Sequence, residues 1–139
     1  IKTKIRETNI KVKVSCDQTI MTRSYPGAFS QVITNLILNS LLHAYEKHDE
    51  GLITIDIQEE NDDLKITYKD DGKGISESNL KKIYEPFFTT KRSEGGSGLG
   101  MHIIYNIVMS NLHGRINCIS KEGSGVIFII YMKKNLGLI

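Results

Sequence analysis

The sequence has few of the features that mark disulfide-stapled, membrane-spanning or nucleic-acid-binding proteins. Its only cysteines are Cys16 and Cys118, each in an apolar, strand-like context, so we expect plain buried thiols in a reducing compartment. No apolar run approaches the roughly 18 residues of a membrane-spanning helix, and no signal peptide is visible. The 18 basic and 16 acidic residues give a net charge of +2 without a basic stripe, which argues against a nucleic-acid partner.

Several common ligand-binding signatures are also missing. None of the four histidines has a Cys or His partner at a metal-ligand spacing. The glycine-rich run 95–100 is not followed by the Gly-Lys-Ser/Thr of a Walker A loop. Met101 stands where a Rossmann fingerprint would need a third spaced glycine. These glycines therefore belong to neither of those two nucleotide-binding loops.

The apolar pattern predicts a single domain over residues 1–139, which begins with Ile1 rather than Met and which we expect to be part of a longer protein. Alternating residues predict strands at 10–14, 20–25, 52–58, 64–69, 115–120 and 126–132. We expect two antiparallel hairpins, one formed by 52–58 and 64–69 and the other by 115–120 and 126–132. Helical spacing predicts helices at 28–47, 76–83 with Ser76 as N-cap, and 100–112. This order indicates an α/β fold, a two-layer sandwich in which a mixed, mostly antiparallel sheet packs on three helices.

The first long helix has an inward apolar stripe and a separate polar face. The stripe consists of Phe29, Ile33, Leu36, Ile37, Ser40, Leu41 and Ala44. Asn35, Asn39 and His43 follow one another at steps of four, so they share the polar face. This face is either a solvated edge or a set of ligand-binding groups. An amide oxygen can bind Mg²⁺ without adding charge repulsion against phosphates.

Asp70 stands where the chain leaves the strand predicted at 64–69, and it opens the run Asp70-Asp71-Gly72-Lys73-Gly74-Ile75. A carboxylate only accepts hydrogen bonds, so in a pocket it suits an exocyclic amino group such as adenine N6. Gly72 and Gly74 would let a flat ring approach the backbone. The alternative is a simple Asp-Asp-Gly turn.

The run Gly95-Gly96-Ser97-Gly98-Leu99-Gly100-Met101 leads directly into an apolar helix. Glycine amides and an uncapped helix N-terminus together suit a polyphosphate. Before this run, Pro86-Phe87-Phe88 has the composition of an anchor that pins a loop to the body of the domain. Lys91 is either a mobile charge that reaches a terminal phosphate or an exposed loop lysine.

Taken in order, these pieces resemble the catalytic and ATP-binding domain of sensor histidine kinases, within the GHKL ATP-binding superfamily. Asn35 to Ser40 resembles the N box, Asp70 to Gly74 the first glycine box, and Glu85-Pro86-Phe87-Phe88 the F box. Gly96-Ser97-Gly98-Leu99-Gly100 resembles the second glycine box and Gly123-Ser124-Gly125 the third. The resemblance implies ATP and Mg²⁺ as cofactors, with Asn39 on the metal, Asp70 on the adenine amino group, residues 96–100 on the phosphates, Lys91 near the γ-phosphate, and residues 84–98 as a mobile ATP lid.

Three positions depart from the family pattern. Asn35 stands where hydrolytic superfamily members carry the glutamate that activates water, which favours phosphoryl transfer over ATP hydrolysis. Leu42 replaces a basic residue that often follows the metal-binding asparagine, so Lys91 would have to supply that charge. Val126 replaces the threonine that usually follows the third glycine box, which removes a hydroxyl near the adenine aspartate.

The resemblance implies a kinase whose acceptor histidine lies on a separate dimerisation domain, with a response regulator receiver domain as the next partner. His43 and His102 are the internal alternatives, and we expect His43 to line the pocket instead. The implied location is the cytoplasm, with no direct membrane contact by this domain. A GHKL-type ATPase and a non-catalytic nucleotide-binding module are the competing functions.

Overall fold

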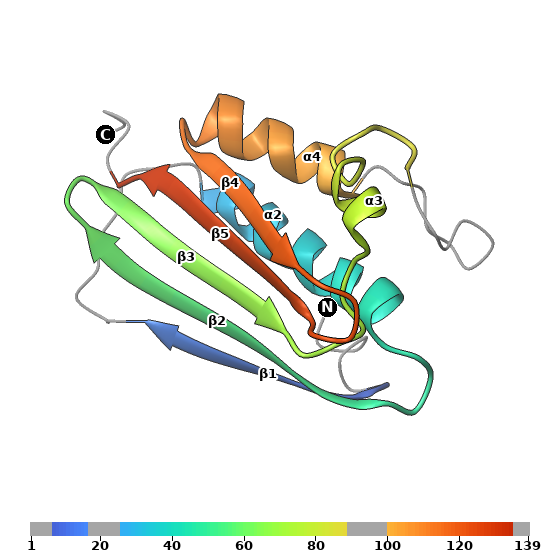
Figure 1. The fold of residues 1–139 in the computed structure, drawn as a ribbon. Coiled ribbons are helices and arrows are strands. Elements are labelled where there is room, and N and C mark those ends of the chain that lie inside the picture. The colour runs from blue at the N-terminus through green and yellow to red at the C-terminus, as the bar shows by residue number, and fades with distance from the viewer. Residues whose placement is uncertain (1–6, 17–25, 89–99, 135–139) are drawn as a thin grey trace.

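The computed structural model describes residues 7–16, 26–88 and 100–134, which form a sheet covered on one face by helices (Figure 1). The predicted strand at 20–25 lies outside the described residues. Within the described part, no helix combines the length and the apolar character that crossing a membrane requires.

Within the described ranges, the sheet has five strands in the order β1-β2-β3-β5-β4. Their bounds are β1 Asn9–Cys16, β2 Glu50–Glu60, β3 Asp63–Asp70, β4 Arg115–Ser120 and β5 Val126–Lys133. β1 pairs with β2 in parallel, and the other three pairings are antiparallel. The predicted α/β sandwich with a mixed, mostly antiparallel sheet is therefore confirmed, and so are both hairpins.

Of the three α-helices in the described residues, two continue into a π-helical turn. α2 (Pro26–Asn39) continues as η1 (Ser40–Ala44), and α4 (Gly100–Asn106) continues as η3 (Ile107–Asn111). Together with its π-helical turn, the first helix thus begins two residues earlier and ends three residues earlier than predicted. The earlier start is consistent with Pro26, because proline suits the first turn of a helix. α3 (Glu77–Leu80) is one turn long, and Ser76 caps it as predicted by accepting from the backbone N–H of Asn79.

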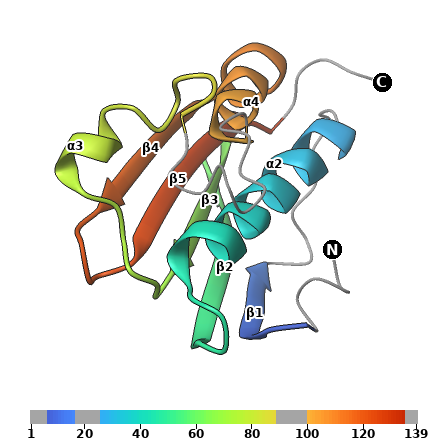
Figure 2. The same ribbon diagram turned by 90° about the vertical axis from the view of Figure 1, so that its right-hand side faces the viewer.

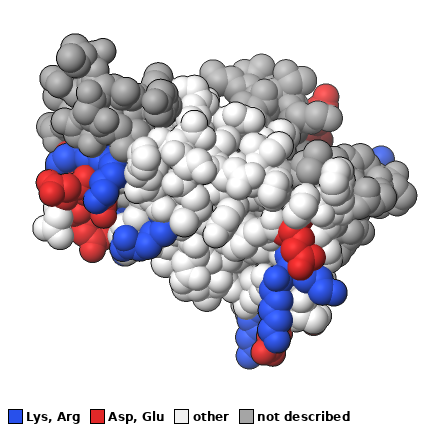
Figure 3. All heavy atoms as spheres, turned by 90° about the horizontal axis from the view of Figure 1, so that it is seen from above, with Lys and Arg blue, Asp and Glu red and all other residues white. Residues whose placement is uncertain are grey.

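The core lies between the sheet and the paired helices α2 and α4, which lie side by side on one face (Figure 2). Alternate residues of β3 and β5 point into it, and Tyr68, Ile66 and Ile130 are almost fully buried. α4 and η3 contain no charged residue. Seen from above, the centre of the surface correspondingly consists of uncharged residues, drawn in white, and the charged side chains lie toward its margins (Figure 3).

The cysteines differ from the expectation of two buried thiols. Cys16 is exposed at the end of β1, and only Cys118 is partly buried. The prediction was wrong for Cys16 because β1 forms one edge of the sheet, where even a strand-like sequence can leave its side chains in solvent. Burial raises the pKa of the Cys118 thiol to about 12, so this thiol is a weak nucleophile.

Hydrogen bonds tie the turn between β4 and β5 to the loop that follows β3. The backbone N–H of Gly123 donates to the carbonyl of Lys73, and the N–H of Ile75 donates to Ser120 Oγ. Ser120 Oγ in turn donates to the carbonyl of Gly125. The segments that resemble the first and third glycine boxes, distant in sequence, therefore form one unit.

Two glycines of this turn give a matched pair for testing that unit. Gly123 and Gly125 both have positive φ, 83° and 73°. A Cβ on Gly123 would meet nothing within 4 Å, whereas one on Gly125 would lie 2.2 Å from the carbonyl oxygen of Asp70. We expect Gly123→Ala to lower the free energy of unfolding by about 1 kcal/mol, and Gly125→Ala to lower it by more than about 3 kcal/mol. Urea denaturation measures both, and equal losses would contradict the close packing at Gly125.

Candidate functional site

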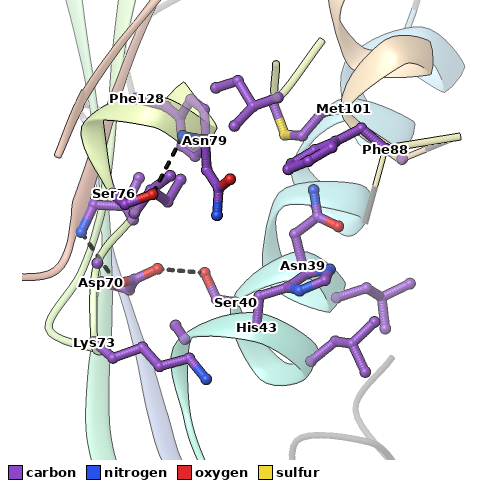
Figure 4. Close-up of a pocket in the computed structure, with 18 of the residues that line it drawn as sticks. Asn39, Ser40, His43, Asp70, Lys73, Ser76, Asn79, Phe88, Met101 and Phe128 are labelled. Carbon is purple, nitrogen blue, oxygen red and sulfur yellow. Dashed lines mark hydrogen bonds between the residues drawn. The ribbon is translucent and has the colours of Figure 1, made fainter. Parts of the chain in front are cut away.

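A cavity of about 660 Å³ opens between η1 and the adjoining end of α2, the end of β3, and the segment around α3 (Figure 4). Its apolar walls include Ile75, Ile83, Met101 and Phe128, and its polar groups include Asn39 and Asp70. Cavities of this size and mixed character hold small organic ligands and cofactors.

Asp70 is the buried carboxylate of this cavity. It is the last residue of β3, and only 2% of its surface is exposed. Its Oδ1 accepts from the backbone N–H groups of Gly72 (3.0 Å) and Val126 (3.2 Å). Burial raises the pKa of Asp70, and the hydrogen bonds from Ser40, Gly72 and Val126 oppose that rise. A carboxyl group held in this way has a fixed orientation toward the cavity.

The other carboxyl oxygen of Asp70 faces a pair of hydroxyl groups. Ser40 Oγ lies 2.8 Å from Asp70 Oδ2 and 2.6 Å from Tyr68 Oη. Tyr68 Oη also lies 2.9 Å from the carbonyl oxygen of Leu36, on α2. These contacts connect the end of β3 to the helical layer directly behind the cavity.

The predicted glycines after Asp70 have different surroundings. Gly74 and Ile75 line the cavity, and Gly74 has a φ of +76° with no room for a Cβ beside the carbonyl of Lys121. Gly72 is not among the lining residues. A Cβ there would lie 2.5 Å from the carbonyl oxygen of Ala44. Gly72 therefore packs closely against η1, and its predicted place beside a flat ring stays a prediction.

Asp71 does not line the cavity and instead hydrogen-bonds to neighbouring segments. Its Oδ1 accepts from Tyr45 Oη at 2.7 Å and from the backbone N–H of Leu52 at 2.9 Å. These hydrogen bonds help to hold the pKa of Asp71 below its usual value, although partial burial opposes them. The two adjacent aspartates thus have separate roles, which the sequence Asp-Asp-Gly does not distinguish.

Asn35, Asn39 and His43 all line the cavity, so the predicted polar face of the first helix faces the candidate site. Asn39 is the last residue of α2, and His43 lies one turn later in the π-helical η1. π-helical turns occur frequently at functional sites. A Cβ on Gly100 would lie 3.1 Å from Asn39 Oδ1, so this glycine leaves space beside the amide.

The glycine-rich run is only partly described. Gly100 and Met101, at the start of α4, line the cavity. Lys91, Gly96, Ser97, Gly98 and Leu99 lie outside the described residues, as does much of the segment predicted to be a lid. The phosphate-binding role of that run therefore stays a prediction.

The two phenylalanines of the predicted anchor point to different environments. Phe88 lines the cavity, whereas Phe87 is 61% exposed and has a φ of +67°. The expectation that both side chains pin the loop stays a prediction for Phe87. A bulky residue rarely adopts positive φ, as Phe87 does here.

Several lining residues were not predicted as site residues from the sequence. Ser40, Lys73 and Asn79 contribute polar groups to the cavity. A signal for Ser40 was present, because it was the one hydroxyl in an otherwise apolar inward stripe. Of the two histidines considered as internal acceptors, His43 lines the cavity, while His102 contacts the carbonyl of Tyr84 and the side chain of Asn106.

Comparisons with known proteins identify the family to which this fold belongs. Residues 25–136 match the family of histidine kinase-, DNA gyrase B- and HSP90-like ATPases. The chain belongs to this family. Among the described residues, no group of three or more His, Cys, Asp or Glu side chains could hold a metal ion.

Within the family, two curated relatives similar to this chain are a sensor histidine kinase and a sporulation kinase. The chain is 37% identical over 111 residues to the sensor histidine kinase ZraS of Escherichia coli (strain K12), which covers 80% of this chain and 23% of ZraS. It is 37% identical over 106 residues to sporulation kinase E of Bacillus subtilis (strain 168), covering 76% of this chain and 14% of that protein. The chain therefore spans less than a quarter of the length of these relatives.

A solved structure gives the same result at the level of the domain. The catalytic domain of histidine kinase ThkA, in a nucleotide-free form, superposes with a TM-score of 0.80 at 30% identity. The match covers 96% of this chain and 85% of that domain. The chain is thus an ATP-binding catalytic domain of the sensor histidine kinase type.

Proposed function

We propose that this domain binds Mg²⁺-ATP in the cavity and transfers the γ-phosphoryl group to a histidine on a separate dimerisation domain. The observation that carries the proposal is the convergence of Asp70 and Asn39, from the sheet and the helical layer, on one cavity of about 660 Å³. The family membership of the chain supports ATP as the ligand.

The adenine end of the proposed site lies at Asp70. A buried carboxyl group beside Ile75, Ile83 and Phe128 combines an acceptor for the amino group with apolar walls for a flat ring. Val126 contributes its backbone N–H to Asp70, and this contact does not need the threonine that usually occupies its position. The missing hydroxyl therefore does not remove the support of the carboxyl group.

The phosphate end of the proposed site lies near Asn39 and the start of α4. An uncharged amide oxygen with free space beside it fits Mg²⁺, which takes few protein ligands and binds phosphate oxygens as well. Bound Mg²⁺ would neutralise charge on the phosphates. Asn39 would orient the triphosphate, and Lys91 with residues 96–100 would contact it from the other side.

The competing ATPase function has less support from the residues at the site. Asn35 lines the cavity at the position where hydrolytic members carry the activating glutamate. An amide cannot act as a general base. We therefore propose that the base and the acceptor histidine belong to the dimerisation domain, that a response regulator receives the phosphoryl group next, and that the domain works in the cytoplasm.

A transfer assay tests this function. The domain is incubated with ATP labelled at the γ-phosphate, alone and with the dimerisation domain of the parent protein. We expect little phosphate release from the domain alone, and label on the added domain with the acid-labile, base-stable behaviour of phosphohistidine. Rapid phosphate release by the domain alone would favour an ATPase, and nucleotide binding without any transfer would favour a non-catalytic module.

A further inference from the structure

The hydroxyl groups behind Asp70 do not carry enough protons for the contacts that they make. Three oxygen–oxygen contacts run in series, from Asp70 Oδ2 to Ser40 Oγ (2.8 Å), to Tyr68 Oη (2.6 Å) and to the carbonyl oxygen of Leu36 (2.9 Å). Each distance is a hydrogen-bond distance, so each contact needs one proton. Ser40 and Tyr68 supply one proton each, and a carbonyl supplies none.

The missing proton can only come from the carboxyl group. If Asp70 is ionised, Ser40 must donate to it, and in this arrangement the Ser40 hydrogen bond lowers the pKa of Asp70. Tyr68 then donates either to Ser40 or to Leu36. One of the two remaining contacts is left as a pair of oxygens without a proton, in a buried place where an unmade hydrogen bond is costly. If Oδ2 carries a proton, Asp70 donates to Ser40, Ser40 to Tyr68 and Tyr68 to Leu36, and all three contacts are satisfied.

We propose that Asp70 is protonated on Oδ2 in the nucleotide-free domain, that Ser40 and Tyr68 are the positioning residues that hold this proton, and that adenine binding releases it. The inference rests on the proposed adenine site. Oδ1 already accepts two backbone N–H groups, so Oδ2 is the oxygen whose state can change. Independently, the burial of Asp70 favours its neutral form.

The charged and titratable neighbours of Asp70 agree with a neutral carboxyl group. Tyr68 on β3, Tyr45 after η1, Asp71 after β3 and Cys118 on β4 interact with it electrostatically, and none of them is a cation. At the cavity, the other ionisable side chains among the described lining residues are His43, Lys73 and Glu122. Lys73 pairs with Glu46 at 3.1 Å, so its charge is partly compensated.

Binding of adenine would change the direction of the hydrogen bonds from Asp70 through Ser40 to Tyr68. An amino group needs an acceptor, so the O–H bond of Asp70 breaks and its proton passes to the solvent. The Ser40 hydroxyl then turns from Tyr68 to Asp70, and the carboxylate accepts from both Ser40 and the amino group. Nucleotide affinity should therefore increase with pH, up to tenfold per pH unit below the pKa of Asp70.

The stability of the nucleotide-free domain should change in the opposite direction. The folded-state pKa of Asp70 is raised above the ordinary value of 3.8. This group then contributes stability that is fully present below pH 3.8 and is lost as the pH rises through the folded-state pKa. A rise in pH through the folded-state pKa of Asp70 would thus lower the stability of the nucleotide-free domain and raise its affinity for nucleotide.

Two measurements test the inference. Carboxyl carbon NMR, with Asp70 assigned by its absence in Asp70→Asn, gives the titration of this group in the nucleotide-free domain. Calorimetry with Mg²⁺-ADP in two buffers of different ionisation enthalpy gives the number of protons released. Tyr68→Phe removes two of the three contacts, those of Tyr68 Oη with Ser40 and with Leu36, and leaves the Ser40 proton for an ionised Asp70. We therefore expect Asp70 in this variant to titrate at lower pH and to release less of a proton. Tyr131→Phe removes a hydroxyl from a half-buried position on β5 and should match the wild type.

The outcomes separate this inference from the function that it rests on. Titration of Asp70 at the same pH in the wild type and in Tyr68→Phe would overturn it. The inference would also be overturned if ADP binding released no more protons from the wild type than from Tyr68→Phe at any pH. His43 is another ionisable side chain at the cavity. Proton release that disappears in His43→Gln but persists in Tyr68→Phe would therefore overturn the inference as well. Failure to bind ADP would contradict the adenine site, and the NMR titration would still locate the proton.

Discussion

Replacement of Asp70 with alanine is expected to weaken Mg²⁺-ADP binding by about thirtyfold or more. The substitution removes the acceptor for the amino group and leaves the amides of Gly72 and Val126 without their partner. A buried hydrogen bond to a charged group contributes about 1.5–3 kcal/mol, which corresponds to roughly 10- to 150-fold in affinity. Isothermal titration calorimetry measures the loss directly.

The adjacent carboxylate provides the matched control for this prediction. Asp71→Asn removes a charge one residue away, but Asp71 contacts Tyr45 and Leu52 and does not line the cavity. We expect this variant to bind ADP within about twofold of the wild type, since rim charges have small effects. Asp70→Asn keeps the shape of the side chain and separates lost recognition from lost packing. Equal affinities of Asp70→Ala and Asp71→Asn would remove the adenine assignment.

Replacement of Asn39 with alanine is expected to lower phosphoryl transfer to the dimerisation domain by about a hundredfold or more. Removal of a single group that stabilises developing charge typically costs 10²- to 10³-fold in rate. Because Asn39 is proposed to act at the phosphate end, adenosine binding should stay within about twofold of the wild type. A single-turnover transfer assay and calorimetry with adenosine measure the two effects.

The control for Asn39 lies one turn earlier on the same helix face. Asn35 also lines the cavity, but it is not the residue that the resemblance assigns to the metal. We expect Asn35→Ala to reduce transfer less than Asn39→Ala, without a change in the Mg²⁺ concentration that gives half-maximal rate. Adenosine binding lost in Asn39→Ala, or a larger effect of Asn35→Ala on the Mg²⁺ dependence, would contradict the assignment.

Much of the fold could be predicted because its sequence patterns are local. The alternation in β3 and β5 gives one buried and one exposed face, and a slip by a single residue would exchange them. The short polar turn 61–63 predicted the β2–β3 hairpin, in which Asn61 adopts a φ of +57°. The face shared by Asn35, Asn39 and His43 follows from the helix period alone.

The remaining features depend on contacts between distant segments. Nothing in the local sequence distinguishes Asp70, which faces the cavity, from Asp71, which packs against Tyr45. The series from Asp70 through Ser40 to Tyr68 joins two elements 30 residues apart. The exposure of Cys16 depends on the edge position of β1, and the π-helical turn at Ser40–Ala44 has no simple sequence signal.

The central claim is that Asn39 and Asp70 bind opposite ends of one adenine nucleotide. A crystal structure of the domain with Mg²⁺ and a non-hydrolysable ATP analogue tests it most directly. The account predicts the adenine amino group within hydrogen-bond distance of the Asp70 carboxyl group and the metal ion on the Asn39 amide oxygen. A nucleotide bound elsewhere, or one that contacts Asp70 while its metal ion lies away from Asn39, would contradict it.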